Sequence, residues 1–549
     1  MTAVDYIIIG AGSAGCVLAN RLSEDPEHRV LVVEAGPGDR SLFIQMPLAF
    51  SFPLANDRYN WFYMSEPELW MDNRRMYCPR GRVLGGSSSI NGMAYVRGHA
   101  LDYDRWAGNA LPGWSYADCL PYFKKAETRA RGGDDYRGDS GPLGVATGAC
   151  ENPLYQAFMA AGQQAGYAYT DDMNGYRQEG VGPMDMTVAG GRRCSTARAY
   201  LRPALQRANV EVLSKSLVTR ILFEGRRAIG IEYYRGSRLQ QIRCDAEVLL
   251  CGGAINSPQL LMLSGIGAGA DLRKLDIDTL ADLPGVGSNL QDHLEIYVQQ
   301  ACTQPISLYS ALNPIRRLGI GIEWLLKHTG TAASNGFEAG GFIRSQAGVR
   351  HPDLQYHFLP IAMNYDGRAP AEGHGYQAHV GPMRPQSRGR VRLRNADPTS
   401  HPSIVFNYMA EERDRQEMRA AVRLTREILA QSAFDPYRGR ELAPGDAVQS
   451  DADLDAFVRS HGESAYHPCG TCAMGHDSQA VVDGECRVHG IEGLRVVDAS
   501  IMPTIVSGNL NAPTIMIAEK TADLIKGVEP LAPSTAPVYI AEHWETTQR

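Results

Sequence analysis

Three closely spaced glycines near the N-terminus constrain the fold of this chain more than any other feature. Gly10, Gly12 and Gly15 follow the apolar run 5–10 and precede the helical run 16–25. The first glycine permits a tight turn, the second lets the backbone approach a diphosphate, and the third lets the helix pack on the strand. The start of that helix offers free N–H groups to an anion. The segment is therefore predicted to bind a dinucleotide.

An acidic residue completes this dinucleotide pattern. Glu34 lies in the second strand-like run, 29–36, and follows Gly15 by 19 residues. A carboxylate at that position suits hydrogen bonding to a ribose diol. The pattern fits either NAD or the adenosine half of FAD, so a nicotinamide-dependent dehydrogenase is one alternative at this point.

Two further strand-like runs indicate how the chain is organised. Residues 247–253 and 493–500 are short and rich in Val, Ile and Leu, as are 5–10 and 29–36. Continuous apolar runs suit strands that helices cover on both faces, as in a doubly wound parallel sheet. Because these runs lie at both ends and in the middle of the 549 residues, an α/β domain assembled from separated segments is expected. The intervening stretches would build a second domain.

Composition excludes several classes of protein. A formal net charge of -7 argues against nucleic acid as the main partner. No stretch approaches the roughly 20 apolar residues of a membrane helix, and the N-terminus lacks the charged start of a signal peptide. The 11 cysteines are scattered, as reduced thiols are in large intracellular proteins. We therefore expect a cytoplasmic protein.

A glycine- and serine-rich stretch, "GRVLGGSSSINGMAYVRG", occupies residues 81–98. Its bare backbone N–H groups suit contact with a polar cofactor. Taken physically, it is either a second anion or flavin contact or an ordinary surface loop.

This stretch and several others resemble the glucose-methanol-choline (GMC) flavoprotein oxidoreductases. The similar segments are the N-terminal region, 81–98, 253–267, 283–293 and 495–520, and the resemblance runs from about residue 4 to about 527. It implies FAD as cofactor and a Rossmann-like FAD-binding domain with an antiparallel-sheet substrate domain. It also implies oxidation of a primary alcohol, with choline to betaine aldehyde as the expected reaction.

The resemblance implies four regions along the chain. Residues 1–300 would form the first part of the FAD domain, with inserted segments of the substrate domain, and residues 301–465 would form mainly the substrate domain. Residues 466–527 would return to the FAD domain and carry the active site. Residues 528–549, with several prolines, are expected to form an extended or loosely ordered tail.

The resemblance also assigns residues to FAD. They are Gly10, Gly12, Ser13, Gly15, Glu34, Val83, Gly86, Asn91, Val218 and Asp498. Some members of the family attach FAD covalently through a histidine in the loop 81–98, but this chain has Ile90 there. We therefore expect FAD to be bound without a covalent link.

Alcohol oxidation removes a proton from the hydroxyl and a hydride from the carbon, so the site needs a base poised near neutral pH. His467 in "ESAYHPCGTCAMG" is the predicted base, because imidazole titrates near working pH and the family places its active-site histidine in this segment. Asn511 would be the second catalytic residue and the N-cap of the last helix, with Pro513 in its first turn. No metal is expected.

Choline needs a counter-charge and aromatic faces, because its trimethylammonium group cannot donate a hydrogen bond. The resemblance assigns these roles to Glu338 and Trp61, with His357 at the hydroxyl end. By themselves, a lone Glu is more often a surface residue and a lone Trp is more often part of the core. Cys469 and Cys472 lack the context of a redox pair or a zinc site and are expected to fill tight space.

Other functions stay open on the sequence. The same scaffold suits dehydrogenases of uncharged aliphatic or aromatic primary alcohols, and it also carries hydroxynitrile lyases that bind FAD without using its redox chemistry. The expected electron acceptor is a quinone or another respiratory carrier, reached by peripheral attachment to the inner face of the cell membrane. The sequence leaves the oligomeric state undetermined.

Overall fold

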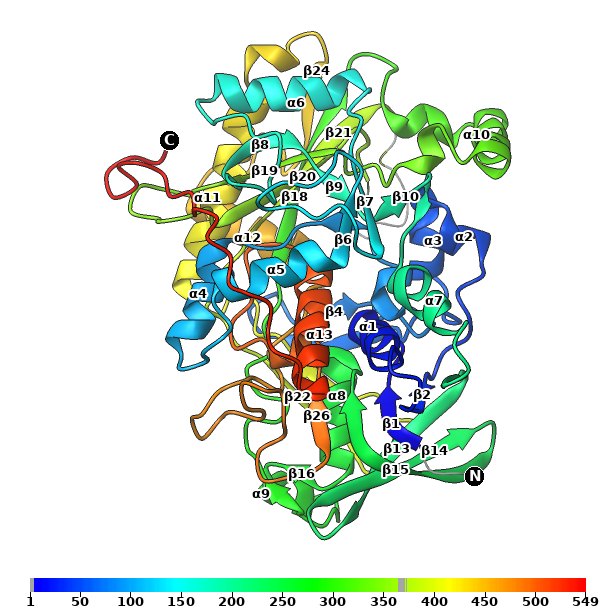
Figure 1. Cartoon of the computed structure of the whole chain (residues 1–549). Helices are drawn as coiled ribbons and strands as arrows, with labels where there is room; N and C mark the ends of the chain where they lie inside the picture. Colours follow the sequence, from blue (N-terminus) through cyan, green and yellow to red (C-terminus); the bar gives the residue numbers. More distant parts are fainter. Residues whose placement is uncertain (1–3, 364–370, 372) are drawn as a thin grey trace.

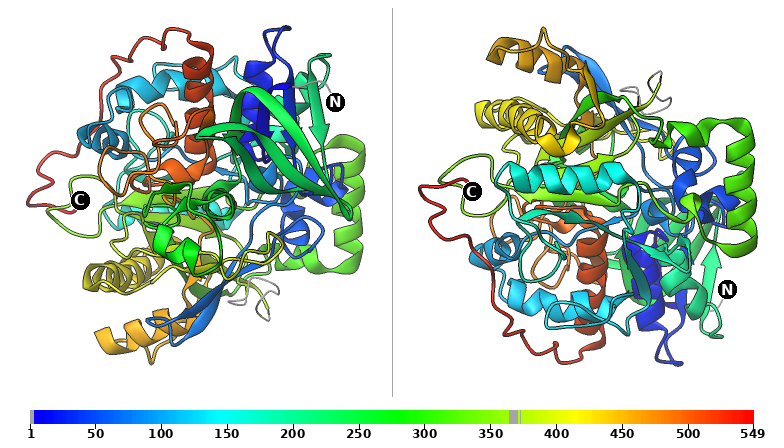
Figure 2. Two further views of the ribbon diagram at one scale, coloured as in Figure 1. Left: turned by 90° about the horizontal axis from the view of Figure 1, so that it is seen from below. Right: turned by 90° about the horizontal axis from the view of Figure 1, so that it is seen from above.

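The computed structural model describes residues 4–363, 371 and 373–549. Two large sheets form the two halves of the molecule, one low and one high in Figure 1. Each sheet is built from segments far apart in the sequence. The two views of Figure 2 show that helices cover both halves.

The first sheet contains the four predicted strands. β1 (Val4–Ile9) lies between β2 (Val30–Val33) and β15 (Arg238–Leu250), and all three run parallel. β12 (Val210–Leu213) extends the sheet beyond β2, and β26 (Leu494–Val496) pairs with β15, also in parallel. The antiparallel strands β13 (Ser216–Glu224) and β14 (Arg227–Arg235) complete it. The expected doubly wound sheet built from separated segments is confirmed.

Helices from both ends of the chain cover this sheet. α1 (Ser13–Leu22) packs against α13 (Asn511–Lys526), and α13 packs against α5 (Tyr116–Ala126). α8 (Gly253–Leu263) follows β15 directly. Their apolar side chains and those of the sheet form one large buried cluster.

The second sheet is antiparallel, as expected. Its strands run in the spatial order β24 (Arg438–Ala443), β18 (Leu294–Cys302), β21 (Gly375–Pro382), β20 (Leu354–Leu359), β19 (Ala339–Ile343) and β8 (Gly180–Pro183). Helices α6 (Pro153–Gln164) and α11 (Glu412–Leu429) pack on it around a second buried cluster. β18 spans the domain boundary predicted at residue 300, and the whole strand belongs to the second sheet. This segment of the second sheet therefore begins at Leu294, before the predicted boundary.

Strands β18, β20 and β21 show strict alternation. Ile296 and Val298 of β18 point into the buried apolar cluster, whereas Glu295, Tyr297 and Gln299 lie on the other face. The sequence "LEIYVQQAC" already contains this alternation. One face of the sheet is thus core, and the other carries polar and aromatic groups.

Among the described ranges, no helix is both long and apolar enough to cross a bilayer.

Candidate functional site

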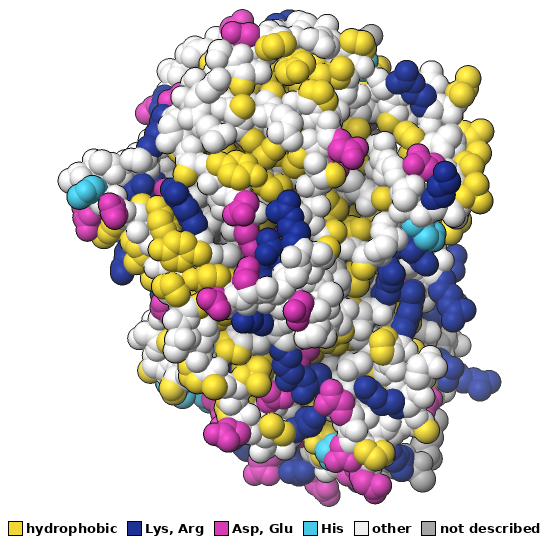
Figure 3. Space-filling model, turned by 45° about the horizontal axis from the view of Figure 1, so that its top comes forward, with side chains coloured by type: hydrophobic (Ala, Val, Ile, Leu, Met, Phe, Trp, Pro, Cys, Tyr) yellow, Lys and Arg dark blue, Asp and Glu magenta, His cyan; other side chains and the backbone are white. Residues whose placement is uncertain are grey.

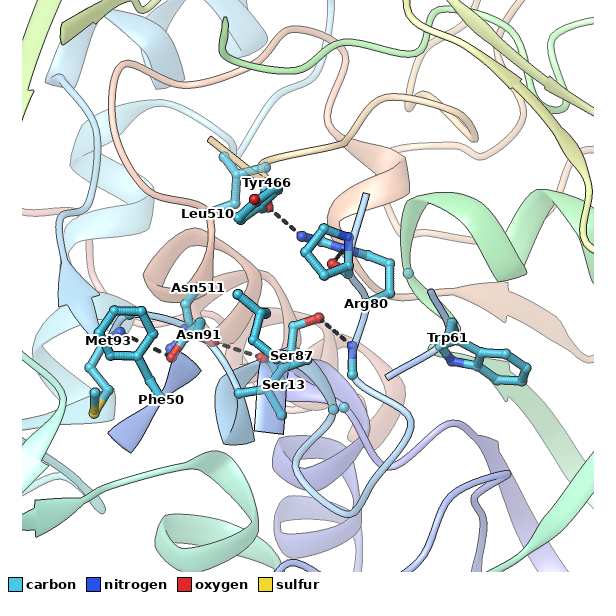
Figure 4. Close-up of a pocket in the computed structure, with 18 of the residues that line it drawn as sticks. Ser13, Phe50, Trp61, Arg80, Ser87, Asn91, Met93, Tyr466, Leu510 and Asn511 are labelled. Atoms are coloured by element: carbon cyan, nitrogen blue, oxygen red, sulfur yellow. Dashed lines mark hydrogen bonds between the residues drawn. The ribbon is translucent and has the colours of Figure 1, made fainter. Parts of the chain in front are cut away.

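A cavity of about 1040 Å³ is lined by residues from both halves of the molecule. One part of its wall comes from the loops after β1, β15 and β26 in the first sheet. Another part comes from the polar face of β18, β20 and β21. Ligands of open α/β sheets bind at the carboxyl ends of the strands, and the cavity lies there. Figure 4 shows side chains of its wall.

The glycine loop forms one end of the cavity. Gly10 has φ +98, and a Cβ there would lie 2.6 Å from the carbonyl oxygen of Cys251. A Cβ on Gly15 would lie 2.0 Å from the carbonyl oxygen of Gly10, so only glycine lets α1 approach the strand this closely. Gly12 and Ser13 line the cavity at the uncapped start of α1. The loop therefore presents free N–H groups to a bound anion.

Glu34 follows β2 and lines the same end. Its carboxylate accepts hydrogen bonds from the backbone N–H groups of Ala11 (2.9 Å) and Gly36 (2.8 Å). Burial raises the pKa of Glu34 to about 7, although these two bonds act in the opposite direction. A buried carboxylate at a cavity wall fits a ribose diol, whose hydroxyl groups would donate to it.

The predicted flavin loop crosses directly in front of the glycine loop. The N–H of Gly85 donates to the carbonyl of Ala11 (2.7 Å), and a Cβ on Gly86 would lie 2.7 Å from the Cα of Gly12. Gly86, Ile90 and Asn91 line the cavity. The functional interpretation of this loop is thus favoured over an ordinary surface loop.

Val83 differs from the expectation. Its side chain is buried with Ile44 and Ile90 in a small apolar cluster, outside the cavity lining. Contact with the flavin through this side chain is not supported. The resemblance implied that this loop lies at the cofactor, and the loop does line the cavity, but the resemblance did not say which way the Val83 side chain turns.

Val218 and Asp498 line the cavity, as the resemblance implied. Asp498 lies two residues after β26 and accepts hydrogen bonds from the Gly253 N–H (2.8 Å) and the Ser257 hydroxyl (2.6 Å). Burial raises the pKa of Asp498, although these donors act in the opposite direction. The Asp498 carboxylate thus joins the start of α8 to the segment that follows β26. Its contact with a cofactor stays a prediction.

Asn511 is not the N-cap of α13. It is the first helical residue, the capping position belongs to Leu510, and no side chain caps the helix. The Asn511 amide oxygen instead accepts from the Ser13 hydroxyl (2.7 Å), a bond that Figure 4 shows. The first backbone N–H groups of α13 therefore have no side-chain cap, and this helix start lines the cavity, as does the start of α1. Two positive helix ends meet there, which suits a polyanionic cofactor.

His467 lines the cavity and lies in a chain of hydrogen bonds. Its Nδ1 lies 3.0 Å from Nδ1 of His293, and its Nε2 lies 3.1 Å from the amide nitrogen of Asn509. Nε2 of His293 lies 3.0 Å from the carbonyl oxygen of Met383. A carbonyl can only accept, so His293 carries its proton on Nε2 and accepts at Nδ1. His467 must then donate from Nδ1, which leaves its Nε2 unprotonated.

The surroundings keep His467 neutral. Burial lowers its pKa well below the usual histidine value, and His293, His357 and Arg80 lower it further. Burial likewise lowers the pKa of His293 to about 4. The backbone N–H of His467 donates to Asp292 (2.6 Å), which fixes the segment. His467 is therefore not poised near neutral pH as expected, because its pKa lies well below that range. It is held as a neutral imidazole, which is the form that a general base requires.

Asn509 lines the cavity and contacts the predicted base, and the sequence analysis missed it. Gln355 donates to the Asn509 amide oxygen (3.0 Å), so the Asn509 NH₂ group must point at Nε2 of His467. The two asparagines of "GNLNAP" thus have different partners: Asn511 contacts Ser13, and Asn509 contacts His467. The only signal in the sequence is the pair itself, two residues apart.

Glu338 does not reach the cavity. Its carboxylate accepts from the backbone N–H of Cys150 (2.6 Å), and the cavity lining includes its neighbour Phe337 instead. This placement does not support the predicted role of Glu338 as counter-ion to choline. Because residues alternate at the start of β19, a shift of one position decides which side chain faces the cavity.

The acid that β18 contributes to the cavity wall is Glu295. Its carboxylate lies 3.0 Å from Nδ1 of His379, and the side chain is 12% exposed. Gln377 is held through its amide oxygen by the Met363 N–H and therefore donates to Nε2 of His379, which leaves Nδ1–H to donate to Glu295. Burial alone would raise the pKa of Glu295, but His379 and other neighbours reverse the effect and lower it. The site thus holds a carboxylate that accepts a hydrogen bond from a histidine.

Aromatic rings gather around His379, the hydrogen-bond partner of this carboxylate. Tyr297 stacks on His379 with ring centroids 3.9 Å apart, and Phe337 meets the rings of His357 and His379 edge-on at 5.8 Å. Tyr297, His379 and His357 are direct partners across β18, β21 and β20. The sheet register therefore places them side by side on its polar face.

His357 and Trp61 line the cavity, as expected. Burial lowers the pKa of His357 to about 4. Trp61 stacks on Tyr63 and has the Arg82 guanidinium 5.4 Å from its ring centroid. In Figure 4 it lies beyond Arg80, away from Asn91 and Asn511. A role for Trp61 toward the substrate stays a prediction.

Cys469 and Cys472 are fully buried with free thiols, and burial raises the pKa of both. Within the part of the chain that the structure describes, no group of three or more His, Cys, Asp or Glu side chains is arranged to hold a metal. Cys469 pairs with Gln291 through its backbone, which positions His467 two residues earlier. These thiols are packing groups of that segment.

The fold, the glycine loop with Glu34 and the neutral His467 at the cavity define a flavin-dependent oxidoreductase. Models of the GMC oxidoreductases match residues 4–295 and 385–518. The chain belongs to the GMC oxidoreductase family.

Known proteins resemble the chain over its full length. The oxygen-dependent choline dehydrogenase of Photobacterium profundum is 56% identical, covering 100% of this chain and 97% of that protein. The one of Paraburkholderia phymatum is 60% identical, covering 98% and 95%. The crystal structure of pyridoxine 4-oxidase from Mesorbium loti is 32% identical with a TM-score of 0.88, covering 96% of this chain and 100% of the other. Formate oxidase from Aspergillus oryzae RIB40, studied for the modification of its FAD, is 26% identical with a TM-score of 0.89, covering 96% and 98%.

FAD is the cofactor, and the protein is an alcohol-oxidising enzyme. The residues fit the cofactor. Along one cavity lie the uncapped starts of α1 and α13, the buried Glu34, and a loop of glycines at which a Cβ would clash with backbone atoms. FAD, when bound, accepts the hydride that leaves the alcohol carbon. Position 90 holds Ile, which offers no nucleophile for a covalent link.

Proposed function

We propose that this enzyme oxidises choline to betaine aldehyde. The observation that carries the proposal is the carboxylate of Glu295 beside a cluster of aromatic rings on the cavity wall. A quaternary ammonium group cannot donate hydrogen bonds, so a nearby negative charge and aromatic faces are the groups that recognise it. The full-length similarity to choline dehydrogenases supports the same substrate.

His467 would take the hydroxyl proton of the substrate at Nε2. The hydrogen bonds from Nδ1 to His293 and from His293 to Met383 fix the ring and its tautomer. The Asn509 amide, already 3.1 Å from Nε2, would donate to the substrate oxygen as negative charge develops on it. Glu295 would thus meet the charged end of choline, and His467 would meet its hydroxyl end.

Electron transfer out of the enzyme is a second part of the proposal. We infer a quinone or another respiratory acceptor and a cytoplasmic enzyme attached peripherally to the membrane. The relatives carry the description oxygen-dependent, which makes oxygen the competing acceptor. Oxygen uptake compared with reduction of a soluble quinone, at equal choline, decides between the two acceptors.

The substrate is tested by anaerobic bleaching of the flavin absorbance with a panel of alcohols. Choline is compared with 3,3-dimethylbutan-1-ol, in which carbon replaces the charged nitrogen, and with benzyl alcohol. We expect the second-order rate constant of flavin bleaching to be at least about 100-fold higher for choline than for the other two alcohols, as loss of one charge pair implies. Equal rates would favour a dehydrogenase of uncharged alcohols. No bleaching by any alcohol, with cleavage of a cyanohydrin, would favour the lyase.

A further inference from the structure

Helix α10 (Pro314–Lys327) carries its apolar stripe on the outside of the molecule. Its exposed apolar residues repeat at helical spacing on one face, and they are Ile315 (83% exposed), Leu318 (65%), Ile322 (47%), Leu325 (49%) and Leu326 (77%). In a helix of a globular protein such a stripe normally faces the core. Here the buried apolar anchor is Trp324, whose indole donates to the carbonyl of Gly191 (2.7 Å).

A second apolar patch adjoins the helix. Leu42, Phe43 and Phe52 of the short helices α2 (Leu42–Gln45) and α3 (Ser51–Leu54) are 44–56% exposed. The rings of Phe43 and Phe52 stack at 4.8 Å, and the Arg317 guanidinium lies 5.3 Å from the Phe52 ring. Contiguous exposed apolar surface of this kind marks a binding surface. We call α10, α2 and α3 together the apolar rim.

The charge of the rim is opposite to that of the whole chain. α10 carries Arg316, Arg317 and Lys327 against Glu323, so three basic groups minus one acid give +2, whereas the chain has a net charge of -7. Its three basic residues are exposed. Figure 3 shows hydrophobic side chains along this edge with Lys and Arg side chains around and below them. An apolar stripe flanked by basic groups is the pattern that binds anionic lipid surfaces.

The shape of the rim favours a bilayer over a folded partner. α10 projects from the edge of the molecule in Figures 1 and 2 and packs on the short helices that flank it in sequence. A projecting convex stripe can insert between lipid headgroups, whereas a protein partner would have to provide a matching groove. We propose that the apolar rim docks this enzyme on the surface of an anionic membrane.

The rim also borders the cavity. Phe43, Phe52, Leu312 and Ile320 line it from the same helices and the loop before α10. Docking would therefore bring this part of the cavity wall to the lipid surface, where a lipid-soluble acceptor resides. The docking surface rests on the peripheral attachment proposed above and specifies which face makes it, whereas the choice of substrate is tested separately by flavin bleaching.

Vesicle flotation of the holoenzyme tests the docking. We expect binding to phosphatidylglycerol–phosphatidylcholine vesicles that weakens with added salt, and weaker binding to phosphatidylcholine alone. The triple variant Ile315→Glu, Leu318→Glu, Leu326→Glu should bind about tenfold less or worse. The matched control is Leu239→Glu, which alters a 51% exposed leucine on β15 in the other half of the molecule and should bind like the parent.

FAD content and turnover with a soluble dye acceptor should be unchanged in the triple variant, because none of its three residues lines the cavity. Full vesicle binding by the triple variant would overturn the proposal. So would absence of binding by the parent enzyme. A parent that sediments as an oligomer, with the variant as a monomer and neither on vesicles, would assign the rim to a second copy of the chain.

Discussion

At the level of single residues, hydrogen bonding decides which nitrogen of His467 can accept a proton. The carbonyl of Met383 fixes the tautomer of His293, and His293 fixes that of His467. On the other side of the ring, Asn509 donates to the unprotonated Nε2 of His467. The base is therefore set by a chain of neighbours rather than by the histidine alone.

Replacing this base should slow the reaction without emptying the cofactor site. In His467→Ala we expect anaerobic flavin bleaching by choline to slow by about 10²- to 10⁴-fold, the usual contribution of a general base. FAD content, measured from the absorbance ratio of the purified protein, should stay at the parental level. Bleaching at the parental rate would remove His467 from the mechanism.

The pH dependence should reveal the lowered pKa of His467. Because burial and its neighbours disfavour the charged imidazole, the neutral base persists below the usual value of about 6.5. The rate of bleaching by choline should therefore change by less than about twofold between about pH 6 and 8. An inflection near pH 6.5 in stopped-flow rates would show an ordinary, solvated histidine instead.

At the level of elements, alternation along three strands makes the substrate wall. β18, β20 and β21 turn one face into the apolar core and the other into the cavity. Tyr297, His379 and His357 meet because they share a register, although His357 and His379 follow Tyr297 by 60 and 82 residues in the sequence. Each strand alone shows only an alternating pattern.

This explains what the sequence could and could not predict. The parallel strands and the glycine loop were predictable, because a continuous apolar run and a glycine turn are local features. His467 was placed in the cavity by its segment. Glu295 was missed and Glu338 was wrong as a cavity residue, because which acid faces the cavity depends on pairing between distant strands. The N-cap assignment of Asn511 failed because Ser13, from the other end of the chain, takes its side chain.

The glycine loop predicts a clean contrast between two substitutions. Gly15→Ala would put a Cβ 2.0 Å from a backbone carbonyl, whereas a Cβ on Gly38 meets no atom within 4 Å. We expect Gly15→Ala to lose FAD and stability, by about 1–3 kcal/mol or more, because backbone on both sides cannot yield easily. Gly38→Ala should stay yellow and melt like the parent. A fully loaded Gly15→Ala enzyme would contradict the close packing of α1 on the strand.

At the level of the whole molecule, the chain crosses between the two halves repeatedly, and its last residues tie them together. The tail 528–549 runs as an extended segment from α13 to the second sheet, seen in red in Figure 1. The N–H of Ser534 donates to Ala117 (2.8 Å) in the first half. Arg549 donates twice to Glu427 (both 2.7 Å) in the second. The tail is extended, as expected, and it is anchored along its length.

Deleting the tail should loosen the link between the halves. A chain that ends at residue 528 is expected to melt about 2–5 °C lower, since it loses these bonds and the buried surface beneath them. Arg549→Ala alone should cost only about 0.2–1 kcal/mol, because the ion pair is partly exposed. Differential scanning calorimetry of the holoenzymes measures both. Identical melting of the truncated and parent proteins would show that the tail lies on the surface without holding it.

The most direct test of the central claim compares two glutamates with two substrates. Glu295→Gln should lower kcat/KM for choline by about 100-fold or more, while that for 3,3-dimethylbutan-1-ol changes little, because only choline carries the charge that the carboxylate meets. Glu338→Gln, outside the cavity lining, should affect both alcohols alike. The opposite result, with choline selectivity lost in Glu338→Gln and kept in Glu295→Gln, would contradict the site described.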